Sequence, residues 1–290
     1  MNKLTLGTVQ FGIPYGINNV QGQVSESEIA KILDVAYNSD ISILDTASLY
    51  GNSEELLGKF AAGRFNIISK IKEVPENQNW SAEKLKDWLE QEIDSSLQNL
   101  NCNQLYAYLL HRPLDLLKYK DLKYFESLEK LKESGKTSKI GFSVYTPNDL
   151  EQLYSQYKPD LVQLPMNVLD CEFLKSGWLD RLKEDNVEIH VRSIFLQGLL
   201  LMSFEDQMLK FPNYSAIWKK WHQQLKDNNL TAIEACWNFV NQYKQIDNII
   251  VGVLSSSELT EISEIPKPEM GFIDLAISDE NLIYPSNWKK

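Results

Sequence analysis

The chain has 290 residues, of which 43% are hydrophobic and 24% charged, and its formal net charge is −11. This acidic charge argues against nucleic-acid binding, which needs clustered lysine and arginine side chains to replace counterions. The sequence contains no run of 18 apolar residues that would predict a membrane span, and its N-terminus has no signal-peptide pattern. We therefore expect a soluble, cytoplasmic protein that does not bind membranes.

Short apolar runs rich in Ile, Val and Leu recur along the whole chain, and each is short enough to be a buried strand. They lie at regular intervals and are separated by longer polar segments. The predicted strands cover residues 3–9, 41–46, 65–71, 105–111, 139–144, 160–165, 187–193 and 248–253.

The segments between these runs place apolar residues at i, i+3, i+4 and i+7, as a helix packed on a sheet requires. The predicted helices cover residues 26–39, 53–63, 82–100, 124–136, 147–157, 176–186, 231–244 and a last one that starts near 255. Eight strands alternating with eight helices predict an α/β fold of the (β/α)8 TIM barrel type. A doubly wound open sheet is the weaker alternative, because GxGxxG is absent.

No linker or charge block divides the chain, so we predict a single domain over residues 1–290. Two segments interrupt the alternation, one after the sixth strand (166–176) and one after the seventh (199–229). We predict these to be loops, and long loops in a compact barrel are usually functional lids. The tail, 264–290, is rich in proline and acidic residues.

Polar side chains stand at the carboxyl ends of three neighbouring predicted strands, the end of a TIM barrel where active sites lie. They are Asp45, Lys70 and His111, and Tyr50 follows in the loop after Asp45. A tyrosine titrates near pH 10, and a neighbouring ammonium lowers its pKa. A carboxylate can hold the lysine, and a histidine can donate a hydrogen bond to a carbonyl oxygen. The group therefore predicts a metal-free site that gives a proton to a developing alkoxide.

Each of these residues also has a structural interpretation. Asp45 alone suits a turn or a helix cap, and Lys72 competes with Lys70 for the strand end. We expect structural roles for the other two histidines, His190 within the seventh strand and His222 on a surface helix. The three cysteines are far apart and form no CxxC motif, which argues against a zinc site and indicates reduced thiols. Four functional groups at adjacent strand ends favour function over four separate structural roles.

Several segments in the same order resemble the aldo-keto reductase superfamily. DTASLYGNSEELLG is similar to the signature D-T-A-x-x-Y-G-x-S-E-x-x-L-G, and shorter matches occur in five other places. The matching segments are 6–12, 45–58, 68–70, 108–113, 140–147 and 162–167. The resemblance implies a reductase that transfers hydride from a nicotinamide cofactor to an aldehyde or ketone.

The resemblance also implies roles for individual residues. Tyr50 would be the general acid, Lys70 would lower its pKa, Asp45 would pair with Lys70, and His111 would orient the carbonyl. The residues implied in cofactor binding are Gly7, Thr8, Ser143, Gln163, Arg192, Ser193, Gly252, Ser255, Ser256, Glu258 and Glu261. Of these, Ser143 and Gln163 would hold the carboxamide, and Arg192 would replace the tyrosine that many members place under the nicotinamide ring.

The loop after the eighth strand lacks the Lys and Arg that commonly hold the 2′-phosphate of NADPH in this family. It offers three serines, and Glu258 stands near the usual arginine position. Serines and helix N-terminal amides can bind phosphate, whereas a carboxylate repels phosphate and suits a free ribose hydroxyl. The family default is NADP(H), and NAD(H) is the alternative.

The substrate is expected to be a small-molecule carbonyl compound, with sugar-derived carbonyls included by analogy. Residues expected in the loops around the pocket are Trp80, Arg112, Tyr145 and Trp178, each of which also suits loop packing or a structural ion pair. The alternative function is a regulatory protein that keeps the fold and cofactor but turns over weakly. Another kind of barrel enzyme would need paired carboxylates or a metal cluster. The sequence predicts neither the oligomeric state nor the pathway.

Overall fold

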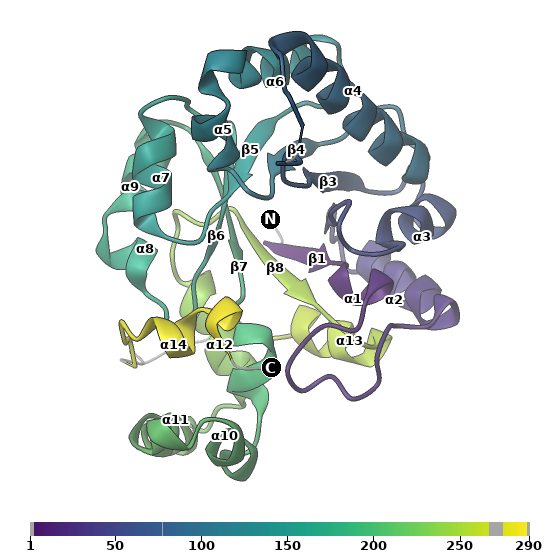
Figure 1. Ribbon diagram of the computed structural model, residues 1–290. Coiled ribbons are helices and arrows are strands. Elements are labelled where there is room, and N and C mark those ends of the chain that lie inside the picture. The colour runs from purple at the N-terminus through teal and green to yellow at the C-terminus, as the bar shows by residue number, and fades with distance from the viewer. Residues whose placement is uncertain (1–2, 77, 267–274, 289–290) are drawn as a thin grey trace.

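Eight parallel strands close into a barrel in sequence order, as Figure 1 shows, and the eighth strand pairs with the first. The computed structural model describes residues 3–76, 78–266 and 275–288. The strands are β1 (Leu4–Gly7), β2 (Ile43–Asp45), β3 (Asn66–Ile71), β4 (Ala107–Leu110), β5 (Ile140–Ser143), β6 (Leu161–Pro165), β7 (Glu188–Arg192) and β8 (Asn248–Gly252). All eight lie within the predicted ranges, which confirms the (β/α)8 fold class.

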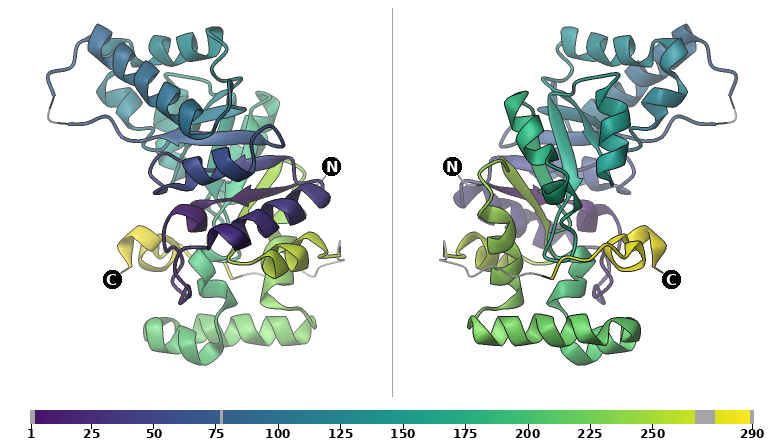
Figure 2. Two further views of the ribbon diagram at one scale, coloured as in Figure 1. Left: turned by 90° about the vertical axis from the view of Figure 1, so that its right-hand side faces the viewer. Right: turned by 90° about the vertical axis from the view of Figure 1, so that its left-hand side faces the viewer.

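An outer layer of helices covers the barrel (Figures 1 and 2). The helices at the predicted places are α2 (Glu26–Asn38), α3 (Ser53–Phe60), α4 (Ala82–Asn99), α6 (Tyr124–Glu133), α7 (Pro147–Tyr154), α9 (Trp178–Glu184), α12 (Ala232–Asn241) and α13 (Ser256–Ser263). Shorter helical pieces are α1 (Val9–Gly12), α5 (Asp115–Lys118), α8 (Glu172–Lys175), α14 (Glu280–Ile283), η1 (Lys120–Leu122), η2 (Leu196–Leu201), η3 (Pro212–Tyr214) and η4 (Pro285–Asn287). Within the described ranges, no helix combines the length and apolar character that crossing a membrane requires.

Hydroxyl side chains fix where several of these helices begin. Ser25, Ser81 and Ser255 each accept a hydrogen bond from the backbone amide three residues further on. Thr146 and Thr231 do the same and add a capping box, in which an acidic side chain at the third helical position accepts from the cap amide. Each cap satisfies an amide that has no partner within the helix, so the local sequence sets the start of the helix.

Two layers of the barrel interior follow from the alternation of side chains along each strand. A small apolar cluster fills the middle of the interior, and the next inward positions towards the carboxyl ends of β2 to β4 carry polar groups. The cluster consists of Ile43, Ile68, Ala107, Leu109 and Leu161, and Asp45, Lys70 and His111 stand two residues beyond Ile43, Ile68 and Leu109. The polar site therefore rests on a packed apolar floor.

The amino-terminal end of the barrel carries a separate polar network. His190 is fully buried, and its Nε2 lies 2.6 Å from Oε1 of Glu188. Lys139 forms an ion pair with Glu188 and donates to the hydroxyl of Tyr106. His190 thus lies in the middle of β7 and bonds to Glu188 at the amino-terminal end of the strand, outside the cavity lining, in agreement with the structural role expected for it.

A pair of helices replaces the loop predicted over 199–229, so the loop prediction is wrong, whereas His222 lies on a helix as expected. α10 (Phe204–Lys210) and α11 (Ser215–Asp227) form a lobe below the barrel in Figure 1, which both views of Figure 2 also show. Trp218 and Trp221 are fully buried, and their ring nitrogens donate to backbone carbonyls of Phe211 and Leu200. Buried indoles with satisfied N–H groups make this lobe a packed unit. Part of the tail predicted over 264–290 lies outside the described residues.

Candidate active site

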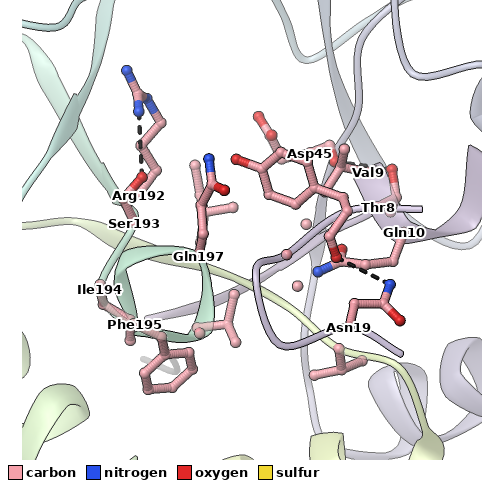
Figure 3. Close-up of a pocket in the computed structure, with 18 of the residues that line it drawn as sticks. Thr8, Val9, Gln10, Asn19, Asp45, Arg192, Ser193, Ile194, Phe195 and Gln197 are labelled. Carbon is pink, nitrogen blue, oxygen red and sulfur yellow. Dashed lines mark hydrogen bonds between the residues drawn. The ribbon is translucent and has the colours of Figure 1, made fainter. Parts of the chain in front are cut away.

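A cavity of about 380 Å³ opens at the carboxyl ends of the barrel strands. Figure 3 shows its two sides: Thr8, Gln10 and Asp45 lie across from Arg192 and Ser193, and Gln197 lies between them. The lining also includes Tyr50 and His111, so the cavity brings together three of the four predicted proton-transfer residues, Asp45, Tyr50 and His111.

A buried ion pair joins β2 to β3 beneath the cavity. Nζ of Lys70 lies 2.6 Å from Oδ1 of Asp45, and the two side chains are only 1% and 6% exposed. Lys70 also donates to the carbonyl oxygen of Thr46 at 2.8 Å, and Nε2 of Gln163 donates to Oδ2 of Asp45 at 2.8 Å. Burial lowers the pKa of Lys70, and the charge of Asp45 opposes that shift. The geometry brings Lys70 and Asp45 together as the sequence predicts.

Tyr50 stands above this pair. Nζ of Lys70 is 5.2 Å from the centre of the Tyr50 ring, and the ring of His111 meets it edge-on at 5.8 Å between centres. Burial, followed by the charge of Asp45, raises the pKa of Tyr50 above its ordinary value. The net shift of this pKa is thus upward, opposite to the expected lowering, because burial and the charge of Asp45 dominate and the ammonium of Lys70 directs its hydrogen bonds to Asp45 and Thr46. The phenol is held in its protonated form.

His111 is held neutral. Burial, with the nearby charges of Lys70, Arg192 and Arg112, lowers its pKa to about 3. Its Nδ1 atom is buried and has no hydrogen-bond partner among the residues that the structure describes. A neutral imidazole has one N–H donor and one acceptor nitrogen, so His111 can donate one hydrogen bond into the cavity without carrying charge.

The loop that carries Tyr50 is positioned by contact between two glycines. A side-chain carbon at Gly12 would lie 1.6 Å from the carbonyl oxygen of Tyr50, and one at Gly51 would lie 2.3 Å from the carbonyl oxygen of Gly12. Gly51 also has a positive φ of 55°, a conformation that other residues adopt at a cost. Only glycine at both positions lets α1 and the Tyr50 loop touch backbone to backbone.

Buried hydroxyls tie the same loop to β1. Oγ1 of Thr8 donates to the carbonyl of Asp45 at 3.0 Å, and Oγ of Ser53 donates to the carbonyl of Thr8 at 3.0 Å. Thr46 contributes a third hydroxyl, 3.1 Å from that of Ser53. Thr8, predicted to bind the cofactor, lines the cavity and also fixes the end of β2. These bonds hold Asp45 and Tyr50 on one rigid frame.

Arg192 brings a second positive charge to the cavity. Its Nη2 donates to the carbonyl oxygen of Val144 at 2.9 Å, and its guanidinium lies 4.5 Å from the centre of the Tyr145 ring. Its Nε is buried without a hydrogen-bond partner in the described part of the chain. The guanidinium therefore stacks on an aromatic ring of the protein.

A model described as "Aldo/keto reductase family" matches residues 3–268, nearly the whole chain. The chain belongs to the aldo/keto reductase family. The arrangement of Asp45, Tyr50, Lys70 and His111 is thus found in a chain that this family model covers from β1 to beyond α13.

Individual members of the family are distant from this chain. An aldo-keto reductase of Strobilurus tenacellus is 28% identical over 188 residues, which cover 61% of this chain and 53% of that protein. An aldo-keto reductase of Schizosaccharomyces pombe, named for NADP(+), is 24% identical and covers 69% of this chain and 62% of that protein. The chain therefore matches little more than half the length of these curated relatives.

The fold agrees with solved structures over a longer span. An aldo-keto reductase of Bacillus halodurans, solved in its holo form, superposes with a TM-score of 0.71 at 20% identity. The superposition covers 91% of this chain and 86% of that one. At this identity the likeness shows the fold alone.

Most of the residues that the family pattern implies in cofactor binding line the cavity of this aldo/keto reductase. Three do not. Ser255 caps α13, Ser256 donates to Glu28 of α2, and Glu261 is exposed on the surface of α13. Those that line the cavity are Gly7, Thr8, Ser143, Gln163, Arg192, Ser193, Gly252 and Glu258.

One of the four predicted substrate residues, Tyr145, lines the cavity. The ring nitrogen of Trp80 donates to the carbonyl of Pro75 at 2.8 Å, and Trp178 is buried in α9. Arg112 lies 3.7 Å from Glu73 at the surface. These three therefore have packing or ion-pair roles outside the cavity.

Sequence reasoning missed five polar lining residues: Gln10, Tyr15, Asn18, Asn19 and Gln197. The first four follow β1, so the rule that active sites lie after the strand ends could have found them. Gln197 has a positive φ of 55°, and its carbonyl accepts from Ile17 at 3.0 Å. This bond joins the loops after β1 and β7 across the cavity, a pairing that no local pattern reveals. Among the described residues no group of His, Cys, Asp or Glu is suited to hold a metal ion.

Proposed function

We propose that this protein is an NAD(P)H-dependent reductase of aldehydes or ketones, in which Tyr50 donates the proton. The observation that carries the proposal is the buried Asp45–Lys70 pair beneath a cavity that Asp45, Tyr50 and His111 line together. Membership of the aldo/keto reductase family supports the same reaction class.

The cavity fits an extended, polar cofactor. Its lining includes Tyr50 and His111 after the strand ends and extends to Glu258 and Ile262 of α13. Within the described residues, the buried Oε1 of Gln10 has no hydrogen-bond donor, as expected for a polar atom that meets a ligand. Ser143 and Gln163 would hold the nicotinamide end, and Glu258 lies at the other end. A bound nicotinamide supplies the hydride.

Residues of the chain itself supply the proton and orient the carbonyl group. Tyr50 keeps its proton because burial raises its pKa, so it enters the reaction as a donor. The neutral His111 donates a hydrogen bond to the carbonyl oxygen and orients it. When the phenol gives up its proton, the charge of Lys70 stabilises the phenolate. Asp45 keeps Lys70 in place through the 2.6 Å hydrogen bond.

The proposed substrate is a small carbonyl compound, and sugar-derived carbonyl compounds are among those to be tested. Tyr145 contributes an aromatic wall at the cavity mouth. The alternative is a cofactor-binding regulatory protein with little turnover. The intact set of Asp45, Tyr50, Lys70 and His111 favours the enzyme, because binding a cofactor does not require all four.

The test measures oxidation of NADPH and of NADH with a panel of aldehydes, ketones and sugars, for the protein and for Tyr50→Phe. We expect turnover with at least one carbonyl, and a loss of kcat of roughly 10²–10⁴-fold in Tyr50→Phe with unchanged cofactor affinity. Full activity of Tyr50→Phe would rule out the proposed proton donor. Tight cofactor binding without turnover on any carbonyl would favour the regulatory alternative.

A further inference from the structure

A carboxylate from another helix occupies the start of α13. Oε1 of Glu28, on α2, accepts hydrogen bonds from the backbone N of Ser256 at 2.8 Å and from its hydroxyl at 2.7 Å. α2 and α13 lie side by side in the outer layer (Figure 1). A helix N-terminus carries free amides and a partial positive charge, which favour an anion. Here the anion is supplied by the protein itself.

Glu28 stays ionised in the physiological range. Hydrogen bonds from the backbone and side chain of Ser256, together with one from Lys31, lower its pKa to about 2. Nζ of Lys31 lies 3.1 Å from Oε2 of Glu28, and its side chain is 66% exposed. The start of α13 therefore has an amide, a hydroxyl and a nearby ammonium, all directed at one carboxylate.

This place borders the far end of the cavity. The cavity lining continues from Gly252 through Leu254 to Glu258 and Ile262, on both sides of Ser256 in the sequence. The reactive ring of the cofactor must lie beside Tyr50, at the near end, for proton and hydride to reach one carbonyl group. The adenosine half of an extended dinucleotide then approaches the start of α13.

The charges at this end are unfavourable for a phosphate. The carboxylate of Glu258 lines the cavity and accepts from the backbone N of Leu254 at 2.7 Å. Residues 248–263 contain no Lys or Arg. The amide and hydroxyl of Ser256, which belong to the groups that hold phosphate at helix N-termini, are already bound to Glu28.

We propose that Glu28 determines cofactor specificity: its carboxylate takes the donors at the start of α13 that a 2′-phosphate would need, so NAD(H) is preferred over NADP(H). This inference rests on the proposed nicotinamide-dependent function. NAD(H) carries free ribose hydroxyls, which donate to carboxylates, whereas a 2′-phosphate is repelled by them. Glu28 acts together with Glu258, but only Glu28 occupies the helix N-terminus.

The test is a binding measurement that needs no substrate. The Kd values of NADPH and NADH are measured by calorimetry for the protein, for Glu28→Gln and for Glu28→Ala. Gln removes the charge but can still accept from Ser256, whereas Ala also frees Ser256 and Lys31. Glu26→Gln is the matched control, because Glu26 lies on the same helix and pairs with Lys59 at the surface. Melting temperatures establish that each variant is folded.

We expect the unaltered protein to bind NADH more tightly than NADPH. Glu28→Ala should shift the ratio of the two Kd values towards NADPH by about tenfold or more, Glu28→Gln by less, and Glu26→Gln not at all. The shift in the Kd ratio that Glu28→Ala causes should be smaller at high salt, because part of this shift is electrostatic. An unchanged ratio in folded Glu28→Ala, or tighter binding of NADPH by the unaltered protein, would overturn the inference and leave the proposed function standing. Binding of neither cofactor would overturn both.

Discussion

Asp45 and Lys70 form an ion pair that is almost completely removed from solvent, with 2.6 Å between Oδ1 and Nζ. Each charge depends on the other, because an isolated charge in a protein interior is strongly destabilising. The pair is therefore part of the fold as well as of the candidate active site.

Asp45→Asn should lower the free energy of unfolding by about 3–5 kcal/mol, because it leaves the Lys70 ammonium buried without a counter-charge. Urea unfolding followed by circular dichroism measures this loss. Lys59→Gln is the control, since it breaks the exposed ion pair with Glu26 and should have little effect. If both substitutions changed stability equally, the Asp45–Lys70 pair would have no special structural role.

His111 should make stability depend on pH in the acidic range. Its pKa is about 3 in the folded chain against an ordinary value of 6.5, so between these values the unfolded chain takes up a proton that the folded chain does not. Stability is then lost as the pH falls from 6.5 towards 3, by up to about 1.4 kcal/mol per pH unit.

His111→Gln removes that contribution. Unfolding free energies of the two proteins, measured at intervals from pH 8 to pH 4, should show a shallower decline for His111→Gln below pH 6.5. Above pH 7 the two curves should run parallel. Parallel curves over the whole range would mean that His111 titrates normally in the folded chain.

Gly51→Ala should reduce activity because the added carbon would lie 2.3 Å from the carbonyl oxygen of Gly12 and would displace the Tyr50 loop. A displacement of the proton donor by about 1 Å can lower kcat by about 10²-fold. Gly63→Ala is the matched control: Gly63 also has a positive φ, 75°, but nothing lies within 4 Å of its added carbon. Both should lose some stability, whereas only Gly51→Ala should lose kcat. Equal kcat values would show that the glycine contact does not position Tyr50.

Trp218→Ala should destabilise the α10–α11 lobe by about 3–5 kcal/mol, because the indole is fully buried and its N–H bonds to the carbonyl of Phe211. Leu209→Ala in the same lobe is the control, since its side chain is 81% exposed and its removal should change stability by less than about 0.5 kcal/mol. Limited proteolysis of the lobe, alongside urea unfolding, compares the two variants. Resistance of Trp218→Ala to protease would contradict a packed role for the indole.

The sequence predicts the barrel well because strand and helix periods are local properties. The ends of β2, β3 and β4 were predicted to within three residues, and this brought Asp45, Lys70 and His111 to one end of the barrel. The α10–α11 lobe is not predicted as a packed pair of helices, although a helix is expected at His222, because the alternation of one strand and one helix leaves no place for extra helices.

Other features of the site depend on contacts between distant parts of the chain. The pKa of Tyr50 is raised by the burial of its ring and by the charge of Asp45 beside it, and local sequence does not reveal how deeply the ring is buried. Glu28 and Ser256 are 228 residues apart, and no pattern in either segment predicts their contact. The sequence thus predicts the reacting groups better than the electrostatics around them.

The cavity is complete only when β1 and β8 are paired. Gly7 and Gly252 are partners in that pairing, and both line the cavity. During synthesis, a nascent chain that ends before β8 already carries Asp45, Tyr50, Lys70 and His111 but lacks the wall against which a cofactor would lie. A cofactor site of the kind proposed would therefore form only once β8 has paired with β1, so cofactor affinity would measure closure of the barrel.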